Sequence, residues 1–175
     1  MTETTDKHNA ADTLVLCLGN DIRSDDGVGW AVADELTLAA GSPTTRLPNP
    51  DPRIPACVVR RSALSGFYLL DELIGHDRVI VVDAVKTGAH PPGTVLSFPF
   101  EALGTETGPS PHAVGLPSVV KLGRQSGVPL PTRIHIVAIE VDDMESIAEG
   151  LTALVRAAVP RAVAEVRSLL AQGLP

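Results

Sequence analysis

The sequence contains few aromatic residues, only two cysteines and no long apolar segment. Aromatic residues make up 3% of the 175 residues and apolar residues 44%, so the core must consist mainly of Ala, Val, Leu and Ile. Cys17 and Cys57 lie in separate apolar runs without zinc-type spacing, which favours two buried thiols over a disulfide or a metal site. No apolar run approaches the roughly 20 residues that a membrane helix needs. The chain is long enough to bury a core as one domain without a disulfide or a structural metal.

Basic residues are also few, and acidic residues outnumber them. The net charge is therefore −7 and the isoelectric point is near 5.1. This excess of acids argues against nucleic acid or an anionic membrane as a partner, and leaves a basic peptide or a metal-loaded protein open. The first residues, MTETTDKHNAADT, are polar and lack the apolar core of a signal peptide. We expect a cytoplasmic monomer with a disordered tail over residues 1–11 and a single domain over residues 12–175.

Apolar runs of two kinds alternate along the chain. Short β-branched runs such as DRVIVVDA are typical of strands buried on both faces of a sheet, and stretches with helical spacing separate them. Residues 41–55 contain five prolines and are expected to form a surface loop. This alternation predicts an α/β fold, a three-layer sandwich with a mostly parallel (mixed) twisted sheet of about five strands and helices on both faces. The expected strands are 13–19, 56–61, 77–84, 93–100 and 132–141, and the expected helices are 26–40, 65–74, 116–127 and 144–172, with Pro160 dividing the last.

Acidic residues and one histidine follow the expected strands. Asp25 and Asp26 come after the first strand, Asp83 ends the run VIVVDA, and Glu140 ends the last strand. His112 lies in the segment SPHAVGL, which leads into a helix. Because ligands of open α/β sheets bind outside the carboxyl ends of the strands, we expect these side chains to converge on one edge of the sheet.

The segment GNDIRSDDGVGW, which follows the first strand, favours a cation over a phosphate. A nucleotide-binding loop offers backbone N–H groups to the phosphate at the start of a helix. Carboxylates at that position would instead repel a phosphate by several kcal/mol, on the order of the Coulomb energy in a partly desolvated site. The helix dipole keeps such carboxylates ionised, and ionised carboxylates with an imidazole suit a divalent metal. We expect Asp25 to cap the following helix, which leaves Asp26, Asp83 and His112 as the candidate site.

The remaining nucleophiles and histidines carry no expected role. Ser110 precedes His112 too closely to be its triad partner, and Cys17 is expected to be buried. His135 alternates with Ile134 and Ile136 and is therefore expected to face solvent. An ordinary aspartic-protease dyad, in which two carboxylates share a proton, is disfavoured because a nearby histidine and metal would keep both ionised.

Three segments together resemble the hydrogenase maturation endopeptidases: LCLGNDIRSDDGVG, VIVVDAVKTGAHPPGTV and SPHAVGL followed by RIHIVAIE. The resemblance covers about residues 13–157 in the same order. It implies a peptidase, of aspartic type with nickel-dependent recognition, that removes a C-terminal extension from the large-subunit precursor of a nickel–iron hydrogenase after nickel insertion. It implies that Asp26, Asp83 and His112 bind nickel presented by the substrate, that other divalent cations can occupy the site, and that Asp25 is a further candidate for activating water.

The sequence departs from the family pattern in three places. Cys17 stands where the family has the first glycine of its Gly-x-Gly-Asn stretch, and the proline-rich stretch at 41–55 is longer than typical. The Gly- and Thr-rich turn after the second strand reads RSALSG, which keeps only Gly66. That turn lines the cleft in the family, so substrate specificity is the property most affected. Two alternatives use the same chain differently: a non-proteolytic nickel-binding or metal-delivery protein, and a nucleotide-binding α/β module.

Overall fold

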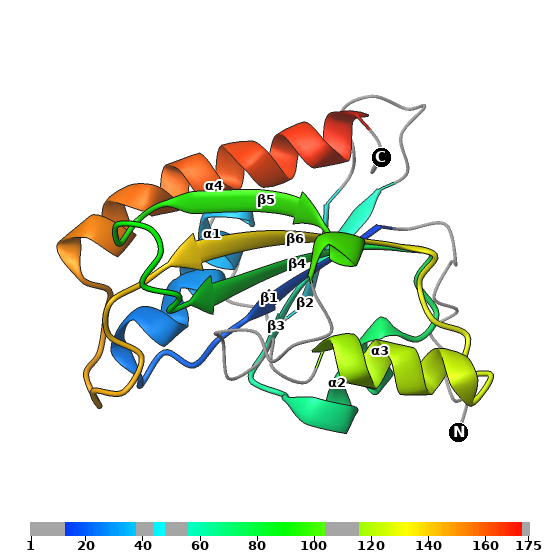
Figure 1. The fold of residues 1–175 in the computed structure, drawn as a ribbon. Helices are drawn as coiled ribbons and strands as arrows, with labels where there is room; N and C mark the ends of the chain where they lie inside the picture. Colours follow the sequence, from blue (N-terminus) through cyan, green and yellow to red (C-terminus); the bar gives the residue numbers. More distant parts are fainter. Residues whose placement is uncertain (1–12, 38–43, 48–55, 104–115, 173–175) are drawn as a thin grey trace, which may run out of the picture.

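The computed structural model describes residues 13–37, 44–47, 56–103 and 116–172, which form a six-stranded sheet covered by helices (Figure 1). The sheet order is β2-β3-β1-β4-β6-β5. The four central strands run parallel, and the edge strands β2 and β5 pair antiparallel to their neighbours. The strands are β1 (Thr13–Leu18), β2 (Thr44–Leu47), β3 (Cys57–Ser62), β4 (Arg78–Val85), β5 (Val95–Pro99) and β6 (Arg133–Glu140).

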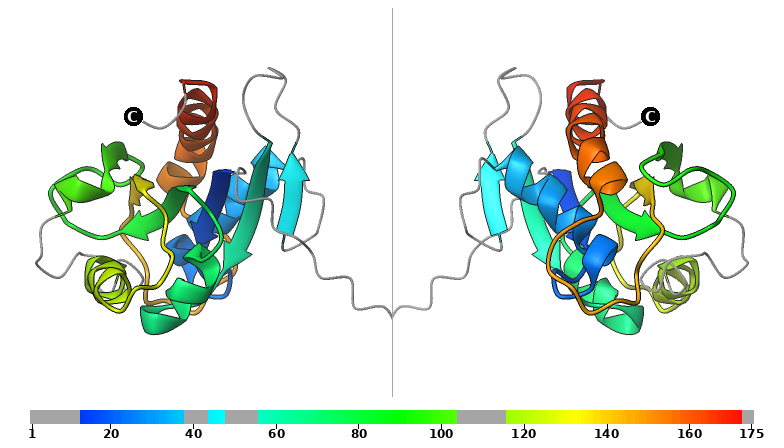
Figure 2. Two further views of the ribbon diagram at one scale, coloured as in Figure 1. Left: turned by 90° about the vertical axis from the view of Figure 1, so that its right-hand side faces the viewer. Right: turned by 90° about the vertical axis from the view of Figure 1, so that its left-hand side faces the viewer.

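Helices cover both faces of the sheet, which confirms the predicted three-layer α/β fold (Figure 2). One face packs against α1 (Val28–Leu36) and α4 (Ala153–Gln172), and the other against α2 (Leu69–Leu73) and α3 (Leu116–Gln125). Three short 3-10 helices complete the described part: η1 (Ser24–Gly27), η2 (Gly66–Tyr68) and η3 (Phe100–Ala102). None of the helices in this part of the chain is both long and apolar enough to cross a membrane.

Strand β4 shows why the sequence runs are continuously apolar. Val79 and Val81 face the core beneath α2 and α3, while Ile80 and Val82 face the core beneath α1 and α4. All four side chains are at most 1% exposed. A strand buried on both faces has no polar side to alternate with, as expected for the centre of a parallel sheet.

Two predicted elements differ from the structure. A sixth strand, Thr44–Leu47, lies inside the proline-rich stretch; the four residues TTRL between Pro43 and Pro48 contain no proline and pair with the edge of β3. Helix α4 begins at Ala153 and runs unbroken through Pro160, so the predicted start at Met144 and the predicted division were wrong. Pro160 is exposed, so its ring meets solvent rather than the core.

The expected exposure of His135 was also wrong. The side chain is 7% exposed, and its Nε2 lies 2.9 Å from the Oγ of Ser97 on β5. Alternation would expose His135 only if its face of the sheet were open to water, and helix α4 covers that face. Burial lowers the pKa of the His135 imidazole below its ordinary value, with the charge of Glu165 opposing that shift.

The connections between the parallel strands locate a crevice. The connection from β1 to β3 runs through α1 on one face and then through the edge strand β2, and α2 connects β3 to β4 on the opposite face. The direction of winding therefore changes at β1, whose neighbours in the sheet are β3 and β4. Ligands of such sheets bind at this switch point, outside the carboxyl ends of the strands. The loop after β1 carries Asp26, and Asp83 lies near the carboxyl end of β4 itself.

Candidate active site at the carboxyl edge of the sheet

Two glycines allow the loop after β1 to fold back tightly on the strand ends. Gly19 has φ +154°, and a Cβ there would collide with the carbonyl oxygen of Asp26. A Cβ on Gly29 would collide with the carbonyl oxygen of Leu18 and lie 3.1 Å from that of Val82. Only glycine fits at such close backbone approaches. The loop of residues 19–27, here called the Gly-Asn loop, is thereby held against the ends of β1 and β4.

The structure places Asp26 and Asp83 at the ends of adjacent parallel strands, and both side chains are 2% exposed. Asp26 belongs to η1 of the Gly-Asn loop, which contacts β4. Asp83 belongs to β4 and shares its face of the sheet with Val81 and Val85, beneath α2 and α3. Burying a carboxylate is costly unless it is hydrogen-bonded, paired or used, so two buried acids at neighbouring strand ends mark the crevice as a candidate site.

A cavity of about 240 Å³ lies beside Asp83. Among its lining residues, Asp83 supplies the carboxylate and Thr87 a hydroxyl, and the others are apolar. A mostly apolar pocket with a few polar groups is the usual form of a binding site. The apolar lining residues are Val81, Val85, Leu96, Phe98, Leu103, Leu116, Ile136 and Ala138.

The prediction that Asp25 caps the following helix was wrong, because neither η1 nor α1 has a side-chain cap hydrogen bond. Its fully buried carboxylate instead accepts hydrogen bonds from the backbone N–H of Thr152 (2.7 Å) and from the Thr152 hydroxyl (3.1 Å). The N–H of Asp143 lies 3.4 Å from the same carboxylate. Asp25 therefore ties the Gly-Asn loop to the loop of residues 141–152 and to the start of α4.

Glu140 reaches the same edge, as predicted, and its carboxylate is also occupied. It is 1% exposed and accepts hydrogen bonds from the N–H of Thr87 (2.7 Å), the Thr87 hydroxyl (2.6 Å) and the N–H of Gly88 (2.8 Å). Three donors to one carboxylate fix the loop that follows β4, on the far side of Asp83. The sequence indicated Glu140 as an edge residue but did not identify Thr87 or Thr152 as the partners of the two structural acids.

The third residue of the predicted site, His112, lies outside the described residues, as does Ser110. Among the residues that the structure does describe, no three His, Cys, Asp or Glu side chains are grouped so that they could hold a metal ion. The role of Asp26, Asp83 and His112 as a ligand set stays a prediction. The donor set itself, two carboxylate groups and an imidazole, suits divalent cations.

The expectation for Cys17 is confirmed. Its side chain is fully buried in β1, and burial raises the pKa of the thiol far above its ordinary value, with a further contribution from the charge of Asp34. A thiol that remains protonated is not a nucleophile. Cys57 is likewise buried and forms no disulfide.

The RSALSG turn packs against the Gly-Asn loop. The carbonyl oxygen of Ser62 accepts hydrogen bonds from the N–H of Gly19 (3.1 Å) and from the indole N–H of Trp30 (3.3 Å). Beyond it, Leu64 is 40% and Phe67 62% exposed. The altered turn therefore leaves apolar side chains in solvent at the same edge as the candidate site.

Comparisons with known proteins point to one family. A family model described as hydrogenase maturation protease matches residues 63–169. The chain is 28% identical over 160 residues to the hydrogenase 2 maturation protease of Escherichia coli (strain K12), which covers 90% of this chain and 89% of that protein. The hydrogenase maturating endopeptidase HybD from E. coli has a similar fold (TM-score 0.67, 24% identity, 93% of this chain and 94% of that chain). So does the [NiFe] hydrogenase maturation protease HybD from Thermococcus kodakarensis (TM-score 0.65, 23% identity, 91% and 99%).

Proposed function

Because the chain belongs to the hydrogenase maturation protease family, we propose that it removes a C-terminal extension from the large-subunit precursor of a nickel–iron hydrogenase. We further propose that it does so after nickel insertion and that it recognises the bound nickel. The match to a protease of this family over nearly the full length of both chains supports the peptidase activity. A neighbour in fold that is described as a [NiFe] hydrogenase maturation protease supports the choice of hydrogenase class.

The observation that carries the proposal is the pair of buried carboxylates at the switch point. Asp26 and Asp83 are each 2% exposed, at the ends of neighbouring strands, and Asp83 also lines a cavity of about 240 Å³. Carboxylates hold divalent cations, and acids at a helix start repel phosphate. This chemistry favours a metal-bearing substrate over the nucleotide alternative.

In the proposed mechanism the metal belongs to the substrate. Asp26 and Asp83, with His112 as the third ligand, bind the nickel that the precursor carries, so that a precursor without nickel is not engaged. That contact fixes the peptide beyond the metal site against the edge of the sheet, and the apolar cavity beside Asp83 accepts a side chain of the same segment. Positioning of this kind supplies a large part of the rate enhancement in many enzymes.

Cleavage adds a water molecule across the scissile C–N bond. The water oxygen bonds to the carbonyl carbon, one proton of the water passes to the leaving amine, and the C–N bond breaks. A carboxylate that moves this proton must have an oxygen available to the water. The hydrogen bonds between Asp25 and Thr152 support a structural role for Asp25, and Asp26 and Asp83, at the ends of the central strands, are the proposed carboxylates for this step.

The test compares two forms of one precursor, loaded with nickel and free of nickel. We expect the purified protein to cut the nickel-loaded precursor and to leave the nickel-free form intact, even when the peptidase is in excess. Mass spectrometry of the product identifies the cut. Equal cutting of both forms would refute nickel recognition and leave a carboxylate-based hydrolase. Nickel-dependent binding of the precursor without any cut would support the alternative of a non-proteolytic metal-delivery protein.

A further inference from the structure

A second hollow lies on the other face of the sheet, beside helix α1, with a volume of about 170 Å³. The Gly-Asn loop forms one wall through Asp21, Ser24 and Gly27, and α1, the end of β3 and residues 150–151 form the others. Since a water molecule occupies roughly 30 Å³, this space is large enough for a guanidinium or an ammonium with its neighbouring methylenes. The hollow is separate from the cavity beside Asp83 and shares no lining residue with it.

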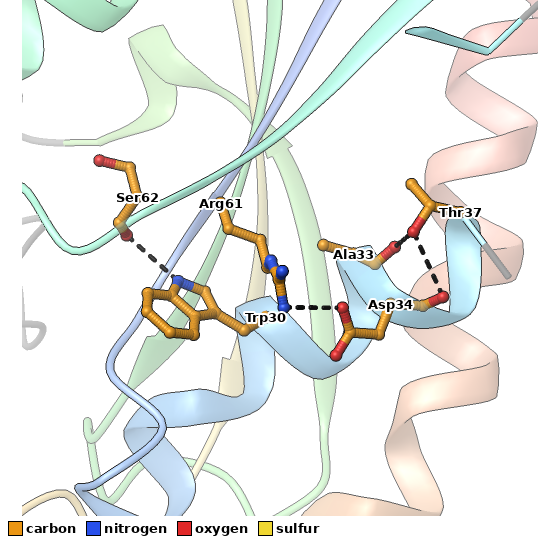
Figure 3. Close-up of polar contacts among 6 residues, drawn as sticks. All are labelled: Trp30, Ala33, Asp34, Thr37, Arg61 and Ser62. Carbon is orange, nitrogen blue, oxygen red and sulfur yellow. Dashed lines mark hydrogen bonds and ion pairs between the residues drawn. The ribbon is translucent and has the colours of Figure 1, made fainter. Parts of the chain in front are cut away.

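An aromatic ring and a carboxylate are already positioned in the wall (Figure 3). Trp30 and Asp34 are four residues apart on α1 and therefore lie on one side of the helix. The guanidinium of Arg61 donates to Asp34 Oδ1 (2.9 Å) and lies 5.7 Å from the centre of the indole ring. The indole N–H is anchored on the carbonyl of Ser62 (3.3 Å). The chain's own Arg61 therefore already occupies Asp34 Oδ1 and lies over the indole ring.

The charges around the hollow favour another cation over an anion. Asp21 and Asp34 line it, against one lining base, Arg61, which is paired with Asp34. The guanidinium of Arg156, next to residue 150, donates to the carbonyl of Leu151 (3.1 Å). The loop of residues 141–152, which closes this side of the Gly-Asn loop, contains four acidic residues and no basic one. Because Arg61 already neutralises Asp34, a positively charged side chain would be attracted by Asp21 and by the acids of the loop of residues 141–152.

We propose that this hollow binds a lysine or arginine side chain of the protein that is cleaved. The inference rests on the proposed function, since it assigns a contact of that same substrate. The Gly-Asn loop carries Asp26 and also forms a wall of the hollow. A basic residue held there lies across this loop from the cavity beside Asp83, and it orients the precursor before the chemical step. Asp21 and Asp34 are therefore specificity-determining residues rather than catalytic ones.

Trp30 allows the hollow to be tested without any proteolysis, because it is the only tryptophan in the chain. We expect its fluorescence to change in a saturable way on titration with N-acetyl-arginine amide, and not with the uncharged N-acetyl-citrulline amide. Added salt should weaken the effect. The variant Asp21→Asn should bind the arginine probe more weakly, and Asp34→Asn should weaken it as well. Glu35→Gln, which removes the same charge from the neighbouring exposed position on α1, should match the wild type.

The second measurement is steady-state cleavage of the nickel-loaded precursor. We expect Asp21→Asn to raise KM about two- to fivefold and to leave kcat unchanged, the size of effect that one solvent-exposed charge contact gives. Glu35→Gln should change neither constant. A fall in kcat at constant KM would overturn the inference, as would equal values for Asp21→Asn and Glu35→Gln.

The two measurements distinguish failure of this inference from failure of the proposed function. If the wild type does not cut the precursor but the arginine probe still binds, the proposed function fails and the preference of the hollow for a cation stands. If the precursor is cut and the arginine probe gives no saturable change, the inference fails and the proposed function stands. A stronger response to N-acetyl-glutamate amide than to the arginine probe would assign the hollow to an anion and also overturn the inference.

Discussion

The two edges of the sheet treat acidic residues differently. Among the described residues, every buried carboxylate lies at the carboxyl edge: Asp25, Asp26, Asp83 and Glu140. At the amino edge, Asp77 precedes β4, is exposed, and accepts a hydrogen bond from the Thr132 hydroxyl (2.9 Å) in solvent. The contrast therefore concerns acids: the one next to the start of β4 is exposed, and those at the strand ends are buried. Strand architecture alone does not require buried acids, so the carboxyl edge needs a further explanation.

Two of the four buried acids hold neighbouring loops in place. Asp25 and Glu140 accept hydrogen bonds from the loops that they hold, Asp25 from Thr152 and Glu140 from Thr87. Asp26 and Asp83 lie between these two fixed points, at the ends of the central strands. We propose that the outer pair keeps the loops rigid and that the inner pair meets the substrate. Pre-organised groups need such support from neighbouring hydrogen bonds.

The largest expected effect comes from the inner pair. Asp26→Asn and Asp83→Asn should each lower precursor cleavage by roughly 10²-fold or more, because each removes a proposed ligand of the substrate's nickel. His112→Ala should have the same effect. Cleavage of nickel-loaded precursor, followed by mass spectrometry, measures the loss. Circular dichroism should show an unchanged fold.

The matched control is Asp77→Asn at the amino edge, which makes the same chemical change in an exposed side chain. It should cleave at the wild-type rate. Activity in the Asp83→Asn variant close to that of Asp77→Asn would remove Asp83 from the site and abolish the contrast between the two edges.

Substitution of Asp25 should lower the free energy of unfolding more than it lowers the rate of precursor cleavage. Asp25→Ala leaves the N–H of Thr152 buried without its acceptor, which should lower the free energy of unfolding by about 2–3 kcal/mol. Asp25→Asn keeps one acceptor oxygen and should lose less. Urea unfolding measures both. Residual cleavage at a temperature where the variants remain folded should stay well above that of Asp26→Asn, and equal loss in the two would make Asp25 catalytic.

Glu140 supports the opposite side of the crevice and should give a smaller loss. Glu140→Gln retains one carbonyl oxygen for the donors of Thr87 and Gly88 and should lower the free energy of unfolding by about 1–2 kcal/mol. Hydrogen exchange at the N–H groups of Thr87 and Gly88 should become faster. The control is Glu101→Gln on η3, where the side chain is exposed. Unchanged exchange in Glu140→Gln would show that the loop after β4 is held by other contacts.

The sequence predicted most of the fold because the strands are continuous apolar runs and the turns are marked by glycine and proline. Strand β4 was found within one residue at each end, and Gly127 follows α3 with φ +74°, as expected of a helix C-terminus. Edge strand β2 was missed because three of its four residues are polar and prolines stand on both sides of it. A break at Pro160 was predicted because proline destabilises the interior of a helix. That prediction was wrong because it did not consider the packing that holds α4 against the sheet.

The sequence predicted which acidic residues lie at the candidate site and at which edge of the sheet. It did not predict which of them are held by hydrogen bonds to distant residues. The alternation of strands and helices predicted a mostly parallel sheet, and the observed strand order places β1 beside β4 and so brings Asp26 and Asp83 to one crevice. The partner of Asp25 is Thr152, 127 residues away in the sequence, and that of Glu140 is Thr87, 53 residues away. No local sequence pattern predicts contacts between residues so far apart in the chain. The same holds for Trp30 and Arg61, whose meeting depends on how α1 lies along β3.

The smallest expected effect concerns His135, a buried base at the middle of the sheet rather than at either edge. Burial lowers the pKa of its imidazole, so the unfolded chain binds more protons than the folded one just below the ordinary value of about 6.5. Folding stability should therefore be complete above that pH and fall as the pH drops toward the folded value. His135→Gln removes this titration and should flatten the pH dependence between neutral and mildly acid solution. The change in slope should stay well below the ~1.4 kcal/mol per pH unit that one whole proton gives.

Urea unfolding at a series of pH values measures this change in slope, with His90→Gln, at an exposed position, as the control. An identical slope in His135→Gln and wild type would mean that His135 protonates in the folded protein as readily as in water.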